Sequence, residues 1–350
     1  MPAPSDRLAR TFYILGLAVL VIACLYLARA YLVPIAIAIL VYLLINAFAA
    51  SLQRTAVLGP RLPGWLAKLF SIIGLFALIS VSVRVIANNV TELGDGLPAD
   101  QGVLLARFEA MIARLGLNFG MTATDVFDRL ALDQVVGWAL GVARGLISDV
   151  SLVFLYVLFL LIDERFYDRK LRALFPDDGQ RRALEASLHR ISTEVRLYLW
   201  LMTLVSLGVA LMTFLACRVT GLDGAGFWAF LAFALNFVPT IGSITAVVLP
   251  AVFGLLTLED PTQLAILIAA LAATQFVAGE LVLPRLMGER LNLSSFVILL
   301  TLVVWGALWG PAGMFMAIPI TVSLAMIAAR FEATRPVAVF LSKDGRIPDA

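Results

Sequence analysis

Amide and hydroxyl side chains stand beside helix-breaking residues in the middle of a long apolar run. Asn236, Thr240 and Ser243 supply hydrogen-bond donors and acceptors, and Pro239 and Gly242 interrupt the helix between them. Backbone groups freed by the break would point inward as well, so the cluster can hold a small hydroxylated solute or a partly dehydrated cation. The alternative is that the side chains only satisfy the broken backbone. We favour binding, because the alternative leaves the break itself unexplained.

A second apolar run is interrupted in the same way. Phe296–Ala329 contains Gly310, Pro311 and Gly313, much as Phe227–Leu256 contains the first cluster. In a bilayer, irregular backbone is tolerated only where protein or a water-filled cavity satisfies its polar groups. Paired, interrupted segments are also the best sequence indication of a transporter's binding site. We expect two broken-helix hairpins whose tips meet to frame a substrate site, with alternating access by movement of one bundle against another.

Polar residues also occur in the apolar run between these two segments. Gln275 and Glu280 are five positions apart, which is about 140° around a helix. An acid in a membrane segment is a functional candidate by default, although near the end of a span Glu280 can instead reach headgroup water or pair with Arg285. The candidate residues of a substrate or ion pathway are Asn236, Pro239, Thr240, Gly242, Ser243, Gln275, Glu280, Pro284, Arg285, Gly310, Pro311 and Gly313.

Other kinds of site have little support. The single histidine, His189, lies in a charged segment, and the two cysteines, Cys24 and Cys217, are ordinary apolar residues far apart in the chain. There is no His-Glu-x-x-His sequence, no pair of aspartates within one span and no Walker-type phosphate loop. We therefore expect a protein that is not an enzyme, holds no metal or cofactor, and transports passively or by using a gradient.

The composition is that of an integral membrane protein. Hydrophobic residues make up 61% of the chain, charged residues 14%, and the mean hydropathy is +0.97. Soluble proteins have about 45–50% apolar and about 25% charged residues. The net charge of +2 does not indicate a nucleic-acid partner, because the basic residues cluster beside membrane ends. The expected partner is the lipid bilayer.

Apolar runs of span length predict an all-α, polytopic fold with broken or re-entrant helices in the C-terminal half and an extramembrane helical insert. Spans are expected at roughly 11–28, 32–50, 65–86, 148–162, 197–217 and 263–283, the last interrupted late by Gln275 and Glu280. The chain then divides into spans 1–3 (1–86), an external amphipathic insert (87–147), spans 4–5 with a charged cytoplasmic loop at 163–196 (148–217), a transport region (218–330) and a cytoplasmic tail (331–350).

The distribution of charged residues predicts how the chain is oriented in the membrane. The 163–196 segment is rich in arginine and the insert is richer in acids than in bases, so the first lies inside and the second outside. Both termini are then cytoplasmic. Within the insert, Gly137, Gly141 and Gly145 give one helix a closely packing face. That face can make an intramolecular contact or a contact between subunits.

Two topologies fit the interrupted segments. Each segment can cross the membrane once as a broken helix, or each can be a re-entrant hairpin that returns to its own side. The hairpins place the loop Pro284–Arg290 in the cytoplasm, and the broken crossings place it outside. Arg285 and Arg290 favour the hairpins.

Three ordered motifs resemble those of the autoinducer-2 exporter (AI-2E) family of bacterial membrane transporters. The motifs are the stretch 235–244 (LNFVPTIGSI) followed by Pro250, the stretch from Gln275 to Gly288, and the stretch 304–314 (VWGALWGPAGM) with Pro319 beyond it. The resemblance covers essentially the whole chain. One departure is Glu280, where many members of the family are expected to carry an amide after Gly279.

The resemblance implies a multi-pass transporter of the bacterial inner membrane, linked to quorum sensing, that exports a small polar metabolite or signal such as autoinducer-2. It also leaves a sodium (cation)/proton antiporter as an alternative, since the family includes members credited with that exchange. A hypothesis of another class is a membrane scaffold that binds partners through the insert. The resemblance and the glycine face of the insert together predict a homo-oligomer.

Overall fold

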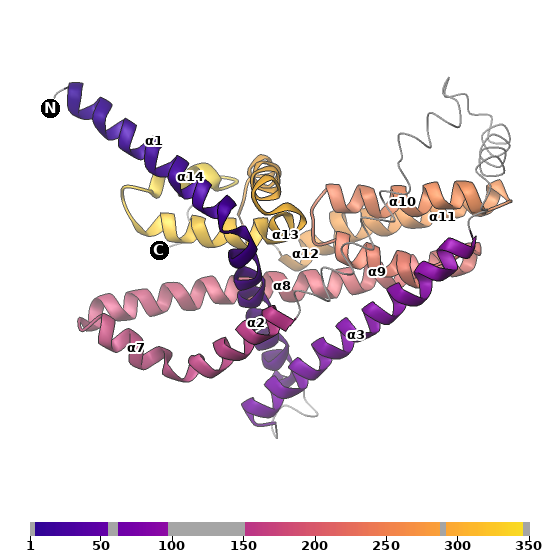
Figure 1. Cartoon of the computed structure of the whole chain (residues 1–350), viewed down its shortest axis with the longest axis horizontal. Helices are drawn as coiled ribbons and strands as arrows, with labels where there is room; N and C mark the ends of the chain where they lie inside the picture. The colour runs from indigo at the N-terminus through magenta and orange to yellow at the C-terminus, as the bar shows by residue number, and fades with distance from the viewer. Residues whose placement is uncertain (1–3, 55–61, 97–150, 288–291, 346–350) are drawn as a thin grey trace. The chain divides into compact units, whose positions relative to one another are not determined.

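The computed structural model describes residues 4–54, 62–96, 151–287 and 292–345, and these are helical apart from turns and one isolated β-bridge (Figure 1). Residues 151–163 form a helix that leads into the following elements. The other helices are α1 (Pro4–Leu27), α2 (Arg29–Arg54), α3 (Gly64–Gly96), η2 (Glu164–Phe166), α7 (Tyr167–Leu174), α8 (Asp178–Thr220), α9 (Ala225–Leu235), α10 (Ile241–Thr257), α11 (Pro261–Phe276), η3 (Val277–Val282), α12 (Leu283–Met287), α13 (Ser295–Arg330) and α14 (Arg335–Leu341).

Four helical stretches of the described chain are long and apolar enough to cross a membrane: 29–53, 178–220, 261–287 and 295–330. Many of the large apolar side chains on these helices are exposed, including Leu204, Ile266 and Val303. Exposed apolar side chains suit contact with lipid, whose chains offer the partners that water does not. The chain is an all-α, multi-pass membrane protein.

Two predicted boundaries differ from the structure. α1 and α2 meet at Ala28 without a loop, because the amides of Tyr31 and Leu32 both donate to the Ala28 carbonyl. α3 continues to Gly96, past its expected end at residue 86, so residues 87–96 of the predicted insert belong to the same helix as the expected third span. The rest of the insert, including Gly141, lies outside the described residues.

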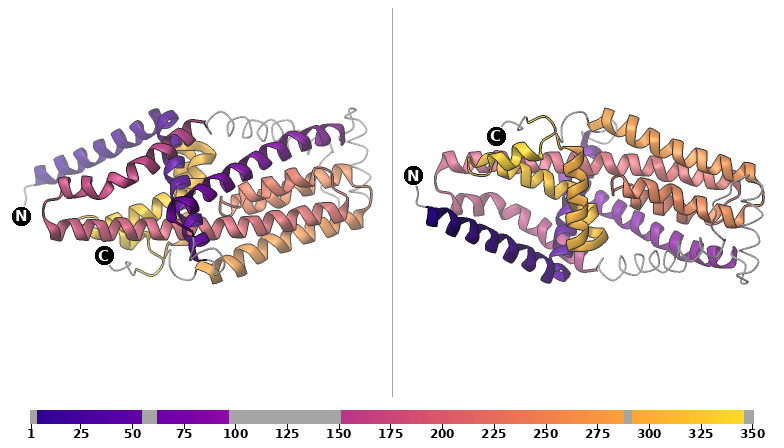
Figure 2. Two further views of the ribbon diagram at one scale, coloured as in Figure 1. Left: turned by 90° about the horizontal axis from the view of Figure 1, so that it is seen from below. Right: turned by 90° about the horizontal axis from the view of Figure 1, so that it is seen from above.

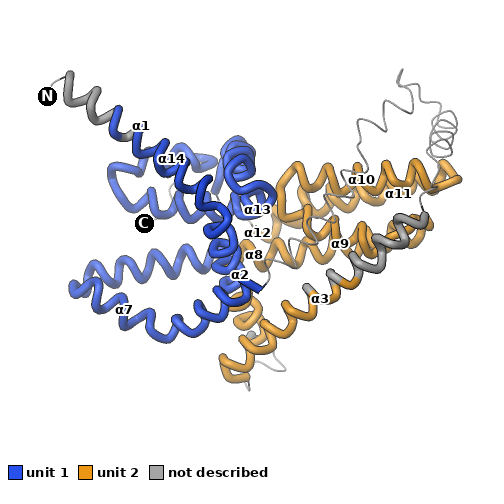
Figure 3. Tube along the Cα trace, in the orientation of Figure 1, with its two compact units in different colours: residues 1–43, 149–195, 291–350 blue, residues 44–148, 196–290 orange. Residues whose placement is uncertain are grey.

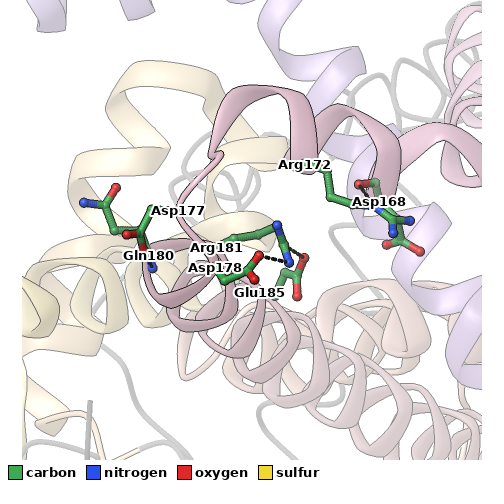
Figure 4. A network of polar contacts seen from close by, with 7 residues as sticks. All are labelled: Asp168, Arg172, Asp177, Asp178, Gln180, Arg181 and Glu185. Atoms are coloured by element: carbon green, nitrogen blue, oxygen red, sulfur yellow. Dashed lines mark hydrogen bonds and ion pairs between the residues drawn. The ribbon is translucent and has the colours of Figure 1, made fainter.

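The segment expected to be a charged loop at 163–196 is largely helical (Figure 4). At the start of α8 the Asp177 carboxylate accepts the amide of Gln180 at 2.8 Å, and Arg181 pairs with Asp178 at 2.5 Å and Glu185 at 3.6 Å. Charges at helical spacing support a helix with one solvated face, and Leu184, Leu188, Ile191 and Val195 recur at helical spacing on another face. The expected span at about 197–217 is thus the second half of the 43-residue helix α8.

The described chain forms two compact units, which Figure 3 shows in different colours. Unit 1 comprises residues 1–43, 149–195 and 291–350, and unit 2 comprises 44–148 and 196–290. Figure 2 shows the same helices from two other sides.

In unit 1 hydrogen bonds hold both ends of α13 to other parts of the chain. Ser294, just before α13, donates its amide to Leu341 at 3.1 Å, and Lys343 donates its amide to Asn292 at 3.0 Å. Leu293 and Ser342 form an antiparallel bridge between these two bonds. We call residues 331–345 the C-terminal strap. At the other end of α13, the Arg330 guanidinium donates to the Ala183 carbonyl at 2.6 Å and to the Ser187 hydroxyl.

In unit 2 an aromatic and aliphatic core joins the end of α8 to α9, α10 and α11. Trp228 of α9 packs against Phe253 of α10 with ring centroids 5.4 Å apart, and its indole nitrogen donates to the Asp223 carbonyl at 3.1 Å. Leu264 and Leu267 of α11 are 2% and 0% exposed in the same core. This core holds α9 and α10 side by side, which fixes the turn between them.

Candidate solute site

The first interrupted segment is a helical hairpin formed by α9 and α10. Its tip is the five-residue turn 236–240, closed by the Val238 amide, which donates to Leu235 at 2.8 Å, and the Gly242 amide, which donates to Val238 at 2.9 Å. A Cβ atom on Gly242 would lie 1.8 Å from the carbonyl oxygen of Leu235. Only glycine lets the two arms approach so closely.

The backbone at the tip is strained. Thr240 has φ 64° and ψ −63°, and the Ile241 amide donates to the Pro239 carbonyl at 2.7 Å across it. This is a γ-turn of the rare, positive-φ kind, a conformation that costs roughly 1–3 kcal/mol for a residue other than glycine. Thr240 is exposed. Strain of this sort persists where the surroundings over-determine it, and it is concentrated at binding and catalytic sites.

A side chain of α8 reaches the same tip. The Asn236 Nδ2 donates to the Ser206 Oγ at 2.9 Å, and Ser206 is 0% exposed. Ser206 is absent from the candidates predicted from the sequence, because it lies in a mostly apolar span that also carries Thr203 and Thr213. A hydroxyl group in such a span was the only sequence signal, and it does not distinguish Ser206 from these two threonines. Ser243, in the first turn of α10, is half-buried near the same tip.

The second interrupted segment is also a hairpin, inside α13. Gly310 has φ 64° and ψ −147°, a conformation open essentially to glycine alone, and Pro311 opens the second arm. A Cβ on Gly313 would lie 1.9 Å from the carbonyl oxygen of Trp305, eight residues earlier. Residues eight apart in a continuous helix are about 12 Å apart along its axis. The two arms of α13 therefore fold back against each other at Gly310.

The tip of α13 is attached to α1. The Trp309 indole nitrogen donates to the Leu25 carbonyl at 3.0 Å, and the Trp305 and Trp309 rings lie 5.0 Å apart. Leu25 belongs to the last turn of α1, where carbonyl groups lack partners within the helix. Trp309 supplies a partner for one of them, and this role was not predicted from the sequence either.

The remaining candidates lie on the helix that follows the first hairpin. Glu280 is exposed and sits in η3, a π-helical turn of Val277–Val282, between Gln275 in α11 and Pro284 in α12. Single π-turns of this kind are common at functional sites. Of the alternatives for Glu280, the pairing with Arg285 is not made: among the described residues, Glu280 makes no ion pair or hydrogen bond.

The π-turn packs against the first hairpin. Ala278 of η3, Ala232 of α9 and Ala246 of α10 are buried in one cluster together with Val205 and Val209 of α8. Unit 2 thus brings Asn236, Pro239, Thr240, Gly242 and Ser243 together at one tip, with the helix of Gln275, Glu280, Pro284 and Arg285 beside it. Gly310, Pro311 and Gly313 form the tip in unit 1. Nowhere in the described ranges do three or more His, Cys, Asp or Glu side chains form a metal-binding group.

Comparison with known proteins finds one family over most of the chain. A model described as "AI-2E family transporter" matches residues 15–332. The chain is 28% identical over 325 residues to "Putative transport protein YhhT" of Escherichia coli K12, covering 91% of this chain and 90% of that protein. It is 25% identical over 334 residues to "AI-2 transport protein TqsA" of the same strain, covering 94% of each. A protein of Haemophilus influenzae named "Putative transport protein" is 29% identical over 334 residues, covering 91% and 92%.

Proposed function

The chain belongs to the AI-2E family of transporters, and on that premise we propose that it is a secondary transporter exporting a small, uncharged, polar metabolite or signal of the AI-2 class. Export crosses the bacterial inner membrane, with both termini in the cytoplasm. The proposed solute contacts are Asn236, Thr240 and Ser243 at the tip of α9–α10. One of the similar proteins is named for AI-2 transport, which makes AI-2 the first solute to test.

The observation that carries the proposal is the electrical neutrality of both hairpins. No charged side chain occurs in residues 224–258 or 291–329. At each tip the C-terminal end of one arm meets the N-terminal start of the next, so the negative and positive ends of two helix dipoles adjoin. A neutral tip with amide and hydroxyl groups suits a solute that both donates and accepts hydrogen bonds. A bare cation would instead need a carboxylate or an unopposed ring of carbonyl groups.

A second candidate function rests on Glu280. This carboxylate lies in a π-helical turn of a membrane-length apolar helix and has no partner in the described chain. Intramembrane acids commonly serve proton or cation pathways. The alternative is therefore a sodium (cation)/proton antiporter in which Glu280 carries the exchanged ion.

The topology is part of the proposal. We propose that α9–α10 and α13 are re-entrant hairpins, each returning to the side from which it enters. The bonds of the C-terminal strap support this for α13, because they hold residues 292–294 beside residues 341–343, at the same end as the tail.

Everted membrane vesicles separate the two functions. With AI-2 as the solute, we expect saturable uptake that Asn236→Ala weakens and Glu280→Gln leaves within about twofold. Antiport would instead appear as sodium-dependent dequenching of a pH-sensitive dye, abolished by Glu280→Gln. If AI-2 uptake equals that of vesicles without the protein, AI-2 is not the solute. A metabolite comparison of cells with and without the protein would then identify the solute.

A further inference from the structure

The tip of α9–α10 is fastened to α8 by a single bond between two side chains. Asn236 and Ser206 are thirty positions apart in sequence, and the Asn236 amide nitrogen donates to the Ser206 hydroxyl at 2.9 Å. Ser206 is 0% exposed, whereas Asn236 is partly exposed. The bond therefore runs from the interior of the helix bundle outward to the proposed solute site.

The packing around this bond keeps Ser206 in place. Its neighbours on α8, Val205 and Val209, pack with three alanines: Ala232, Ala246 and Ala278. Small residues let helix backbones approach closely. Side chains next to Ser206 on α8 are thus buried together with side chains from both arms of the hairpin and from the π-turn.

The bond also orients the carboxamide. An Asn side chain carries donors on its nitrogen and an acceptor on its oxygen. Because the nitrogen of Asn236 is turned toward the buried hydroxyl, its Oδ1 is turned away from Ser206. We propose that Ser206 is a positioning residue of the solute site: it holds Asn236 so that the amide oxygen accepts a hydrogen bond from a hydroxyl group of the solute. This inference rests on the proposed function and names the solute chemistry of the same site.

Two other buried hydroxyl groups of unit 2 are bonded within their own helices. Thr203 donates to the Leu199 carbonyl at 2.7 Å, and Ser71 of α3 donates to the Ala67 carbonyl at 2.8 Å, each four residues back in its own helix. Such bonds satisfy a hydroxyl in an apolar span without contacting another element. Ser206 differs because it accepts from the tip. Ser71→Ala is therefore a matched control: it removes a buried hydroxyl that does not touch the site.

The test compares kinetic constants for AI-2 uptake in everted vesicles that contain the full chain. We expect Ser206→Ala to raise KM about fivefold and leave Vmax within about twofold, because a misdirected amide weakens solute binding by about one hydrogen bond. Ser206→Thr keeps the hydroxyl and is expected to restore KM. Ser71→Ala should change neither constant. Since the two residues act as a unit, Ser206→Ala combined with Asn236→Ala should raise KM no further than Asn236→Ala alone.

The outcomes separate this inference from the proposed function. If Asn236→Ala leaves KM unchanged, the proposed site is wrong. If Asn236→Ala raises KM but Ser206→Ala behaves like Ser71→Ala, the site stands and the role of Ser206 is wrong.

A second measurement does not depend on the solute. In a background with Cys24→Ala and Cys217→Ala, a thiol introduced by Ser243→Cys reports on the tip through its rate of reaction with a water-soluble maleimide. We expect Ser206→Ala to change that rate at least about threefold and Ser71→Ala to leave it unchanged. Equal rates in the two backgrounds would overturn the inference even if AI-2 is not transported.

Discussion

Among single residues, glycine is required at the two hairpins for two different reasons. Gly310 needs glycine because its φ is positive, a backbone conformation that other residues rarely adopt. Space is not the reason, since nothing lies within 4 Å of a Cβ built there. Gly242 and Gly313 need it for space, because a Cβ would overlap a carbonyl oxygen of the opposite arm. The sequence indicates a break at all three positions and does not distinguish these causes.

We expect Gly242→Ala and Gly313→Ala each to destabilise the protein by about 2 kcal/mol, because the added carbon forces two backbones apart. Gly74→Ala is the control, since Gly74 is exposed on α3 with open space around it, and alanine is favoured there by about 0.5–1 kcal/mol. Thermal unfolding in detergent, followed by tryptophan fluorescence, measures both effects. Unchanged melting of the two hairpin variants would mean that the arms are not in contact.

At Thr240 a substitution to glycine should stabilise the protein, in contrast to the destabilising glycine-to-alanine changes. Glycine adopts the positive φ of the γ-turn without strain, so Thr240→Gly should stabilise the fold by about 1 kcal/mol. It also removes a hydroxyl from the proposed site, so AI-2 uptake should fall. A variant that is both less stable and fully active would contradict the assignment of strain to this residue. Thr245→Gly, in the regular part of α10, is expected only to destabilise.

Among the elements, the hairpins depend on contacts made by their neighbours. The core of α8, α9, α10 and α11 supports the first, and the bond from Trp309 to Leu25 supports the tip of the second. Leu25 is in the last turn of α1, three residues before the junction with α2. The tip of α13 and the α1–α2 junction are therefore coupled within unit 1.

Trp309→Phe should disturb this coupling, because it keeps an aromatic ring and removes the indole donor. The Leu25 carbonyl would lose its partner in an apolar segment, at a cost of about 1–3 kcal/mol. Trp305→Phe is the matched control, since Trp305 shares the ring contact and no described residue accepts a hydrogen bond from its indole nitrogen. We expect a lower melting temperature and slower transport for Trp309→Phe than for Trp305→Phe. Equal behaviour of the two variants would exclude a role for the bond.

For the molecule as a whole, the C-terminal strap constrains how often the chain crosses the membrane. The strap holds the start of α13 beside residues that follow its end. If α13 is a re-entrant hairpin, residues 292–294 and 341–343 face the same compartment. If α13 crosses once, they face opposite compartments and the strap cannot form.

A cysteine pair tests this directly. In the background without Cys24 and Cys217, Leu293→Cys and Ser342→Cys should form a disulfide under mild oxidation. Because Leu293 is buried, the single variants Ser295→Cys and Ser342→Cys report on accessibility, and each should react with an impermeant maleimide only in everted vesicles, where the cytoplasmic face is exposed. Labelling of Ser295→Cys from the outside alone would establish the broken crossing. The homo-oligomer stays a separate prediction, because its glycine face lies outside the described residues.

The class of molecule, the family and the positions of the breaks could all be predicted from the sequence. These follow from local physics: span-length apolar runs must be helical in lipid, and the paired proline and glycine residues, Pro239 with Gly242 and Gly310 with Pro311, favour a break in such a helix. The helical course of 163–196 was not predicted, although Leu184, Leu188, Ile191 and Val195 recur there at helical spacing.

Only the tertiary structure determines which polar groups of distant segments contact one another. The bond from Asn236 to Ser206 and the bond from Trp309 to Leu25 join residues 30 and 284 positions apart, and no local pattern encodes such pairs. The same holds for the π-turn at Glu280, which packs into the cluster of Ala232 and Ala246. Helix propensity sets where each element runs, whereas packing between elements sets what its polar groups touch.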